Sequence, residues 1–173
     1  PISWFQEKHG APDSELSAFM WENDTRAAEP AMIPARHFRG AGYVFFREGF
    51  EYGDTLFGLL GQPRLAGHWQ HDRSAFMLEA FGEYLAMDPG MMAYSDPIHR
   101  SMADTRLHNA ITIDGQNSIH ADARVTRFFS SPLVDYAAVD ATAAYPGAER
   151  LVRDAFFIRP GHVVIADDVV LAE

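Results

Sequence analysis

The sequence contains no cysteine, so it can form neither disulfide bonds nor a metal site built on thiolates. It also lacks any apolar run near the ~20 residues of a membrane-spanning helix, and it shows no signal peptide. Positive charge is scarce, since 14 Lys and Arg residues against 24 Asp and Glu residues give a net charge of −10. This balance argues against nucleic acid as a partner, and we expect no membrane partner.

The few basic residues are nearly all of one type. Apart from Lys8, every one is an arginine. The guanidinium group binds carboxylate and sulfate in a bidentate manner, which would suit an acidic glycan. A GC-rich genome would produce the same bias, so both explanations stay open.

Two regions differ in texture. Residues 1–34 are predicted to form a linker with a short helix at 14–21, because Pro30 and Pro34 interrupt regular structure after that helix. Residues 35–173 are predicted to form part of an antiparallel β-sandwich. The chain starts at Pro1 without an initiator methionine and stops directly after an apolar run, so we expect it to be part of a longer protein.

The second region consists of short apolar runs separated by turn residues. The runs that predict strands are residues 43–46, 55–60, 75–81, 110–113, 125–129, 134–139, 151–158 and 163–170. Turns are predicted at 82–83, 88–90, 114–115 and 160–161. Many short strands without a helical pattern between them indicate an all-β protein.

Histidine and aspartate gather in one part of the chain. Five of the eight histidines lie between positions 68 and 120. His71, Asp88 and His108 fall at the ends of three predicted strands, and such ends can converge on one zinc ion, which binds nitrogen and carboxylate ligands. They are also typical of polar residues at the surface and turns of an ordinary sandwich, where Asp88 would accept backbone N–H bonds, and spacing alone favours this interpretation.

Two ordered motifs resemble a known family. Residues 67–90, GHWQHDRSAFMLEAFGEYLAMDPG, resemble the heparinase II/III signature G-H-x-H-x-D-x-x-S-F-x-L-x-A-x-G-x-x-L-x-x-D-P/S-G. Residues 105–116, TRLHNAITIDGQ, are similar to the family's T-x-A-H-N-x-x-x-x-D-G-x-x-Q. Residues 153–169 resemble the following hairpin of the family more loosely.

The resemblance implies roles for particular residues. His68 matches a substrate-facing histidine, and Tyr94 falls where some alginate lyases of this superfamily place a catalytic tyrosine. Asp88 and His108 match two ligands of a structural zinc. Gln70 stands where the family has its third ligand, a histidine. His71, one position later, could replace it only if a bulge shifts the strand register, since 68 and 70 share a face and 71 points away.

The resemblance also implies a function. Family members join an N-terminal α/α toroid to β-sandwich domains and cleave uronic-acid polysaccharides by β-elimination, in the periplasm or after secretion. We therefore expect a polysaccharide lyase that lacks its toroid here and is inactive alone, with an acidic polysaccharide as substrate and a possible homodimeric parent. Two alternatives are a non-catalytic carbohydrate-binding sandwich and a cupin-type metal enzyme, which would need three ligands within a single barrel.

Overall fold

The computed structural model describes residues 32–64 and 69–173. The predicted linker and its helix at 14–21 lie outside the described residues. Residues 34–173 form one compact unit. Within the described ranges the chain has nine strands, three one-turn 3-10 helices and no α-helix, which confirms the all-β prediction. No helix in these ranges is long and apolar enough to cross a membrane.

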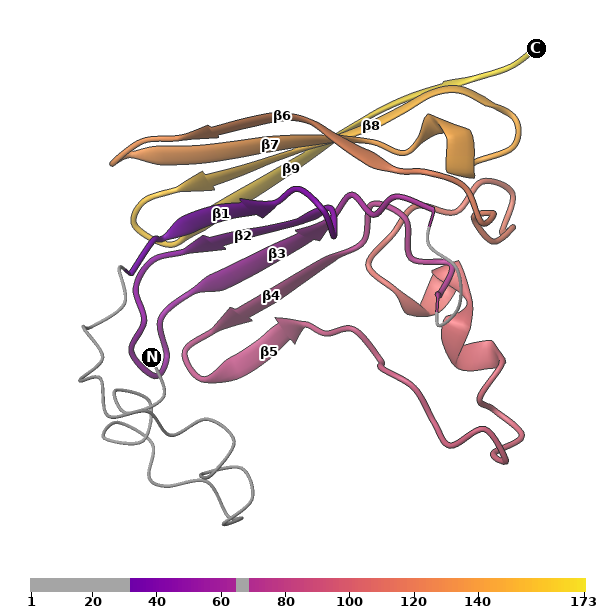
Figure 1. The fold of residues 1–173 in the computed structure, drawn as a ribbon, viewed down its shortest axis with the longest axis horizontal. Helices are drawn as coiled ribbons and strands as arrows, with labels where there is room; N and C mark the ends of the chain where they lie inside the picture. The colour runs from indigo at the N-terminus through magenta and orange to yellow at the C-terminus, as the bar shows by residue number, and fades with distance from the viewer. Residues whose placement is uncertain (1–31, 65–68) are drawn as a thin grey trace, which may run out of the picture. The chain divides into compact units, whose positions relative to one another are not determined.

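The strands form two antiparallel sheets that stack face to face (Figure 1). The five-stranded sheet has the order β1 (Ala35–Phe38), β2 (Tyr43–Arg47), β3 (Leu56–Leu60), β4 (Phe76–Ala80) and β5 (Glu83–Ala86). The four-stranded sheet has the order β6 (Arg124–Ser130), β7 (Val134–Asp140), β8 (Ala148–Ile158) and β9 (His162–Leu171). Every strand therefore pairs with its neighbour in the sequence, as successive hairpins dictate.

The core lies between the two sheets and follows from the alternation along each strand. Phe46 on β2 and Phe57 on β3 are fully buried, and they meet Leu151 and Phe157 from β8. The rings of Phe46 and Phe57 stack with centroids 6.0 Å apart. Alternate residues of these strands point to the outer faces, because side chains of a strand alternate between its two sides.

Tight turns set the register of two hairpins. Phe81 and Gly82, both with positive φ, join β4 to β5, so this turn lies one residue earlier than predicted. The predicted turn at Pro160 and Gly161 joins β8 to β9, where Ile158 pairs with His162.

The predicted strand at 110–113 is wrong. Only Ile113 makes a β-bridge, to Gln116, around a turn in which Asp114 and Gly115 have positive φ. The start of this segment is instead held by side chains, since the carbonyl of Asn109 accepts a hydrogen bond from Arg153. Strands β1 and β5 were not predicted, because both are only four residues long and mostly polar or exposed.

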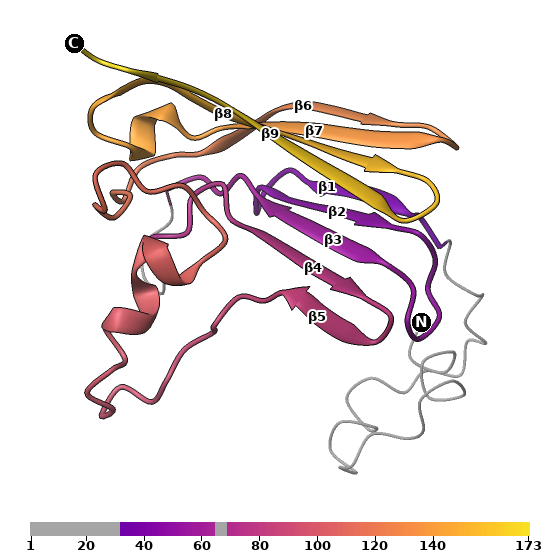
Figure 2. The same cartoon turned by 180° about the vertical axis from the view of Figure 1, so that it is seen from behind.

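A long connection from Met87 to Ala123 joins the two sheets. It contains η1 (Ser101–Ala103) and η2 (Thr105–Leu107), whereas η3 (Thr142–Ala144) lies between β7 and β8. Both views place this connection at one end of the sandwich (Figures 1 and 2). It holds most of the residues that carry the predicted chemistry.

Candidate functional site

Two segments from different parts of the chain meet at the end of the sandwich. They are residues 69–75, which lead into β4, and the connection with η1 and η2. Thr105 joins them, because its fully buried hydroxyl donates to the carbonyl of His71 at 2.6 Å and accepts the N–H of Ser118 at 2.8 Å. The N–H of His71 in turn donates to the carbonyl of Ala103 at 2.9 Å. The two motif segments are thus held together by the Thr105 hydroxyl and by a backbone hydrogen bond.

Asp88 and His108, twenty residues apart, form a hydrogen-bonded pair. Asp88 follows β5, and His108 is the residue at the C-terminal end of η2. Nδ1 of His108 lies 2.9 Å from Oδ2 of Asp88, and the other carboxylate oxygen accepts the N–H of Gly90 at 2.9 Å. Asp88 therefore makes the turn expected of an Asp-Pro-Gly sequence and also reaches the histidine predicted to bind the same zinc ion.

Burial and charge shift the pKa values of this pair in opposite directions. Burial alone would lower the pKa of His108, but the hydrogen bond and charge of Asp88, together with the charge of Asp72, raise it above its ordinary value. The hydrogen bond from His108 lowers the pKa of Asp88, more than burial raises it. The electrostatics of the site therefore favour an imidazolium–carboxylate ion pair.

The second ring nitrogen of His108 differs from the first. Nε2 is buried and has no hydrogen-bond partner. A buried polar atom without a partner is costly, and such atoms usually mark a strained site or a missing ligand. In the imidazolium form Nε2 carries a proton, so it is a buried donor without a hydrogen-bond partner.

Asn109 and Arg153 hold His108 in place. The side-chain amide of Asn109 donates to the carbonyls of Phe76 at 3.0 Å and Met87 at 3.2 Å, so it links the connection to β4 and to the end of β5. Nη1 of Arg153, a core-facing residue of β8, donates to the carbonyls of Ser74 at 2.7 Å and Asn109 at 2.8 Å. A residue of the four-stranded sheet thereby holds the backbone on both sides of the site.

Gln70 and His71 point to different neighbours. The amide of Gln70 donates to the carbonyl of Gly90 at 3.1 Å, next to Asp88. The ring of His71 hydrogen-bonds through Nδ1 to the carbonyl of Ser118 and contacts the ring of Trp69, with centroids 4.7 Å apart. Gln70 is thus the residue of this pair that reaches the Asp88 turn.

The donor set for zinc is incomplete among the described residues. Two ligands of one tetrahedral zinc lie about 3.3 Å apart, given bond lengths of about 2.0–2.2 Å, and the 2.9 Å between His108 Nδ1 and Asp88 Oδ2 is close to this. In the part of the chain that the structure describes, no three His, Asp or Glu side chains group closely enough to hold a metal ion. Zinc therefore stays a prediction, with two of its three predicted ligands side by side.

The two predicted catalytic residues differ in what can be said of them. Tyr94 lies in the connection with 73% of its surface exposed, and its ring is 4.7 Å from that of His99, which bonds to the carbonyl of Met92. Tyr94 is therefore on the surface and not in the core. His68 lies outside the described residues.

Sequence reasoning missed three residues that build the site, namely Thr105, Asn109 and Arg153. Thr105 and Asn109 belong to the second motif, but only its histidine was considered. Arg153 had a clearer signal, because it occupies an inward position of its strand between the apolar residues Leu151 and Ala155. Counting outward from the turn at 160–161 places it opposite Asp167, and the structure pairs the two.

Comparisons with known proteins agree with this architecture. Residues 32–161 match the family described as Heparinase II/III-like, C-terminal. The chain is 25% identical over 135 residues to the heparin-sulfate lyase of Pedobacter heparinus, covering 75% of this chain and 20% of that protein. It therefore spans about a fifth of the length of this curated relative.

Solved structures of longer proteins share the fold. The heparan sulfate lyase HepC from Pedobacter heparinus superimposes with a TM-score of 0.76 at 22% identity, covering 98% of this chain and 27% of that one. A heparinase III structure gives a TM-score of 0.73 at 21% identity, with 98% of this chain and 28% of that one. With the family match over most of its length, the chain belongs to the heparinase II/III-like C-terminal family.

Proposed function

We propose that this chain is the β-sandwich part of a polysaccharide lyase that cleaves a uronic-acid-containing polysaccharide by β-elimination. The observation that carries the proposal is the family match over residues 32–161. It is supported by the named relatives, which are a heparin-sulfate lyase and a heparan sulfate lyase. The parent protein would add an N-terminal α/α toroid and act on an acidic polysaccharide in the periplasm or after secretion, and it could form a homodimer.

The reaction sets three requirements. The uronate carboxylate must be neutralised, a base must take the proton from C5, and an acid must protonate O4 as the C4–O4 bond breaks and a C4=C5 double bond forms. Tyr94, exposed on the surface connection, would exchange the protons. His68 would face the substrate and stabilise the developing anion. The toroid would supply the remaining groups, so the isolated chain would be inactive.

We further propose a structural zinc held by Asp88 and His108, with His71 as the third ligand. The neighbouring Asp88 and His108 atoms support a metal here, because an ion bound by His108 Nδ1 and Asp88 Oδ2 would take the place of the hydrogen bond between them. The contact of His71 with the Ser118 carbonyl means that its ring would have to turn toward the ion. The zinc would fix the end of β5 to the connection and would not take part in the chemistry.

The experiment that tests the proposed function uses the longer protein that contains this chain. Its activity would be followed by the ultraviolet absorbance of the unsaturated uronate product on heparan sulfate, hyaluronan, alginate and ulvan. We expect a rise in absorbance with at least one of them and none with an uncharged glucan. The His68→Ala variant should lower turnover on that substrate.

The same experiment separates the lyase from a binding module. A lyase forms the unsaturated product. A carbohydrate-binding sandwich would retain one of the glycans in affinity electrophoresis without forming that product, and this outcome would overturn the proposal.

A further inference from the structure

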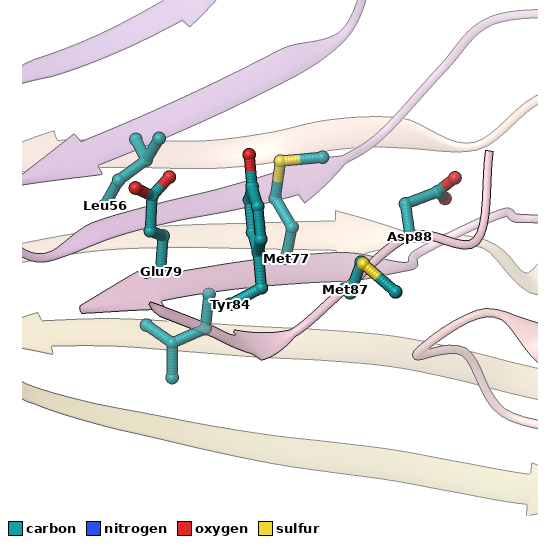
Figure 3. A pocket seen from close by; sticks show the side chains of 7 residues that line it. Leu56, Met77, Glu79, Tyr84, Met87 and Asp88 are labelled. Atoms are coloured by element: carbon teal, nitrogen blue, oxygen red, sulfur yellow. The ribbon is translucent and has the colours of Figure 1, made fainter. Parts of the chain in front are cut away.

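A pocket of about 340 Å³ opens on the outer face of the five-stranded sheet, beside the candidate site (Figure 3). It is lined by Leu56, Met77, Leu78, Glu79, Tyr84, Met87 and Asp88. Figure 3 shows Leu56, Met77, Glu79 and Tyr84 rising from the same side of the sheet. Small-molecule pockets usually hold about 300–1,000 Å³, so this one has room for a single small ring.

A bulge in β5 creates the pocket. Tyr84 and Met87 are three residues apart and would point to opposite faces of a regular strand. The register of β4 against β5 shifts between Leu78 and Glu79, so that Tyr84 pairs with Glu79 while Ala86 pairs with Leu78. The extra residue, Leu85, lets Tyr84 and Met87 both line the pocket. The bulge thus produces a local hollow on the outer face of the sheet.

The lining combines an aromatic face with one available carboxylate acceptor. Tyr84 keeps 70% of its surface exposed, and Met77 and Leu56 form the apolar floor beside it. Glu79 supplies a carboxylate that can accept hydrogen bonds from hydroxyl groups, whereas both oxygens of Asp88 are already bonded to His108 and Gly90. Among the residues that the structure describes, no lysine or arginine lines this pocket. An apolar ring face with hydroxyls at its edge matches this surface, whereas a sulfate or a second carboxylate would be repelled.

We propose that this pocket is a subsite for one uncharged sugar residue of the glycan chain. The inference rests on the proposed function and adds to it. The substrate would carry an uncharged sugar next to the uronate that is cleaved, and dense sulfation at that position would weaken binding. Tyr84 would pack on one face of the ring, and Glu79 would accept from its hydroxyls.

The test uses the 173-residue chain with carbon-13 on its methionine methyl groups, observed by NMR. Met77 and Met87 report on the pocket, and the other methionines are internal controls. The probes are methyl β-glucoside and methyl β-glucuronide, which differ only in the carboxylate at C6, and methyl β-glucosaminide, which carries an ammonium group. We expect the glucoside to shift the Met77 and Met87 signals with millimolar affinity and the glucuronide to bind at least about fivefold more weakly.

Variants assign the effect to the pocket. Tyr84→Ala should abolish the shifts, and Glu79→Gln should raise the affinity for the glucuronide relative to the glucoside. Phe129→Ala removes an exposed aromatic ring from the other sheet and should leave binding unchanged.

Several results would overturn the inference. They are the absence of shifts with the glucoside up to its solubility limit, equal affinity for the glucuronide, tighter binding of the glucosaminide, or shifts that survive Tyr84→Ala. The lyase assay measures product formation by the longer protein and is independent of the binding test. Intact lyase activity without glucoside binding would refute the subsite and leave the proposed function standing. Glucoside binding without any lyase activity would refute the proposed function but not the sugar-binding pocket.

Discussion

Replacing Arg153 by methionine should destabilise the chain strongly. Its side chain is 5% exposed and forms a bidentate ion pair with Asp167, with contacts of 2.7 and 2.9 Å. It also donates to the carbonyls of Ser74 and Asn109. Methionine keeps much of the apolar stem but removes the charge and every donor.

The expected cost depends on the groups that are left without a partner. Breaking a buried ion pair by removing one partner costs about 3–5 kcal/mol. Asp167 keeps 30% of its side chain exposed and can be hydrated, which favours the lower end of this range. We therefore expect a loss of about 3 kcal/mol in the free energy of unfolding, or a fall in Tm of roughly 6–12 °C for a chain of this size.

Arg150 provides a matched control on the same strand. It also pairs with an aspartate, Asp168, at 2.5 Å, but 54% of its side chain is exposed. Exposed ion pairs contribute about 0–1 kcal/mol, so Arg150→Met should change little. Urea unfolding followed by circular dichroism gives both values. An Arg153→Met variant within about 1 kcal/mol of the wild type would refute the idea that this buried ion pair holds the site.

Three further outcomes can be checked. In the chelator-treated chain, the pKa of Asp88 is lowered and that of His108 is raised, so the pair stabilises the folded state between the ordinary pKa of an aspartate and that of a histidine, 6.5. The free energy of unfolding should fall as the pH rises through the raised pKa of His108. Urea titrations across pH should show no such fall in Asp88→Asn. If zinc is bound, elemental analysis should find one zinc ion per chain, and chelation should lower Tm. The His108→Ala variant should contain no zinc. A metal-free chain whose Tm is unchanged after chelation would exclude the zinc site. Tyr145→Phe removes the buried hydroxyl that donates to the Arg73 carbonyl at 2.9 Å, and it should cost about 1–2 kcal/mol in urea unfolding, whereas no loss would show that this bond is not needed.

Much of the fold could be predicted because alternation along a strand is a local property. The runs around Phe46, Phe57 and Phe157 predicted strands, and those strands carry the core. The segment at 110–113 has the same apolar texture, but its neighbour Asn109 is held by a side chain from β8, and a single sequence gives no sign of such a long-range contact. Local pattern therefore overestimated the regular structure at the end of the sandwich.

The site was predicted in part for a similar reason. The motifs named Asp88 and His108, and the structure brings these two together across twenty residues. The pocket around Tyr84 was not foreseen, because it depends on a one-residue bulge that changes which side chains share a face. Which residue would complete the proposed zinc site depends on the placement of Gln70 and His71. Strand periodicity puts the two on opposite faces but does not say which neighbour each contacts.

If this chain contributes to the chemistry of elimination, replacing Tyr94 should show it. The most direct measurement is the initial rate of unsaturated uronate formation by the longer protein and its Tyr94→Phe variant, on the best substrate. Loss of the phenolic proton should lower kcat by about 10²–10⁴-fold, since that is the usual contribution of general acid–base catalysis. Tyr52→Phe, at another exposed tyrosine, should keep the wild-type rate. A Tyr94→Phe protein that cleaves at the wild-type rate would contradict the account and place the proton transfer outside this chain.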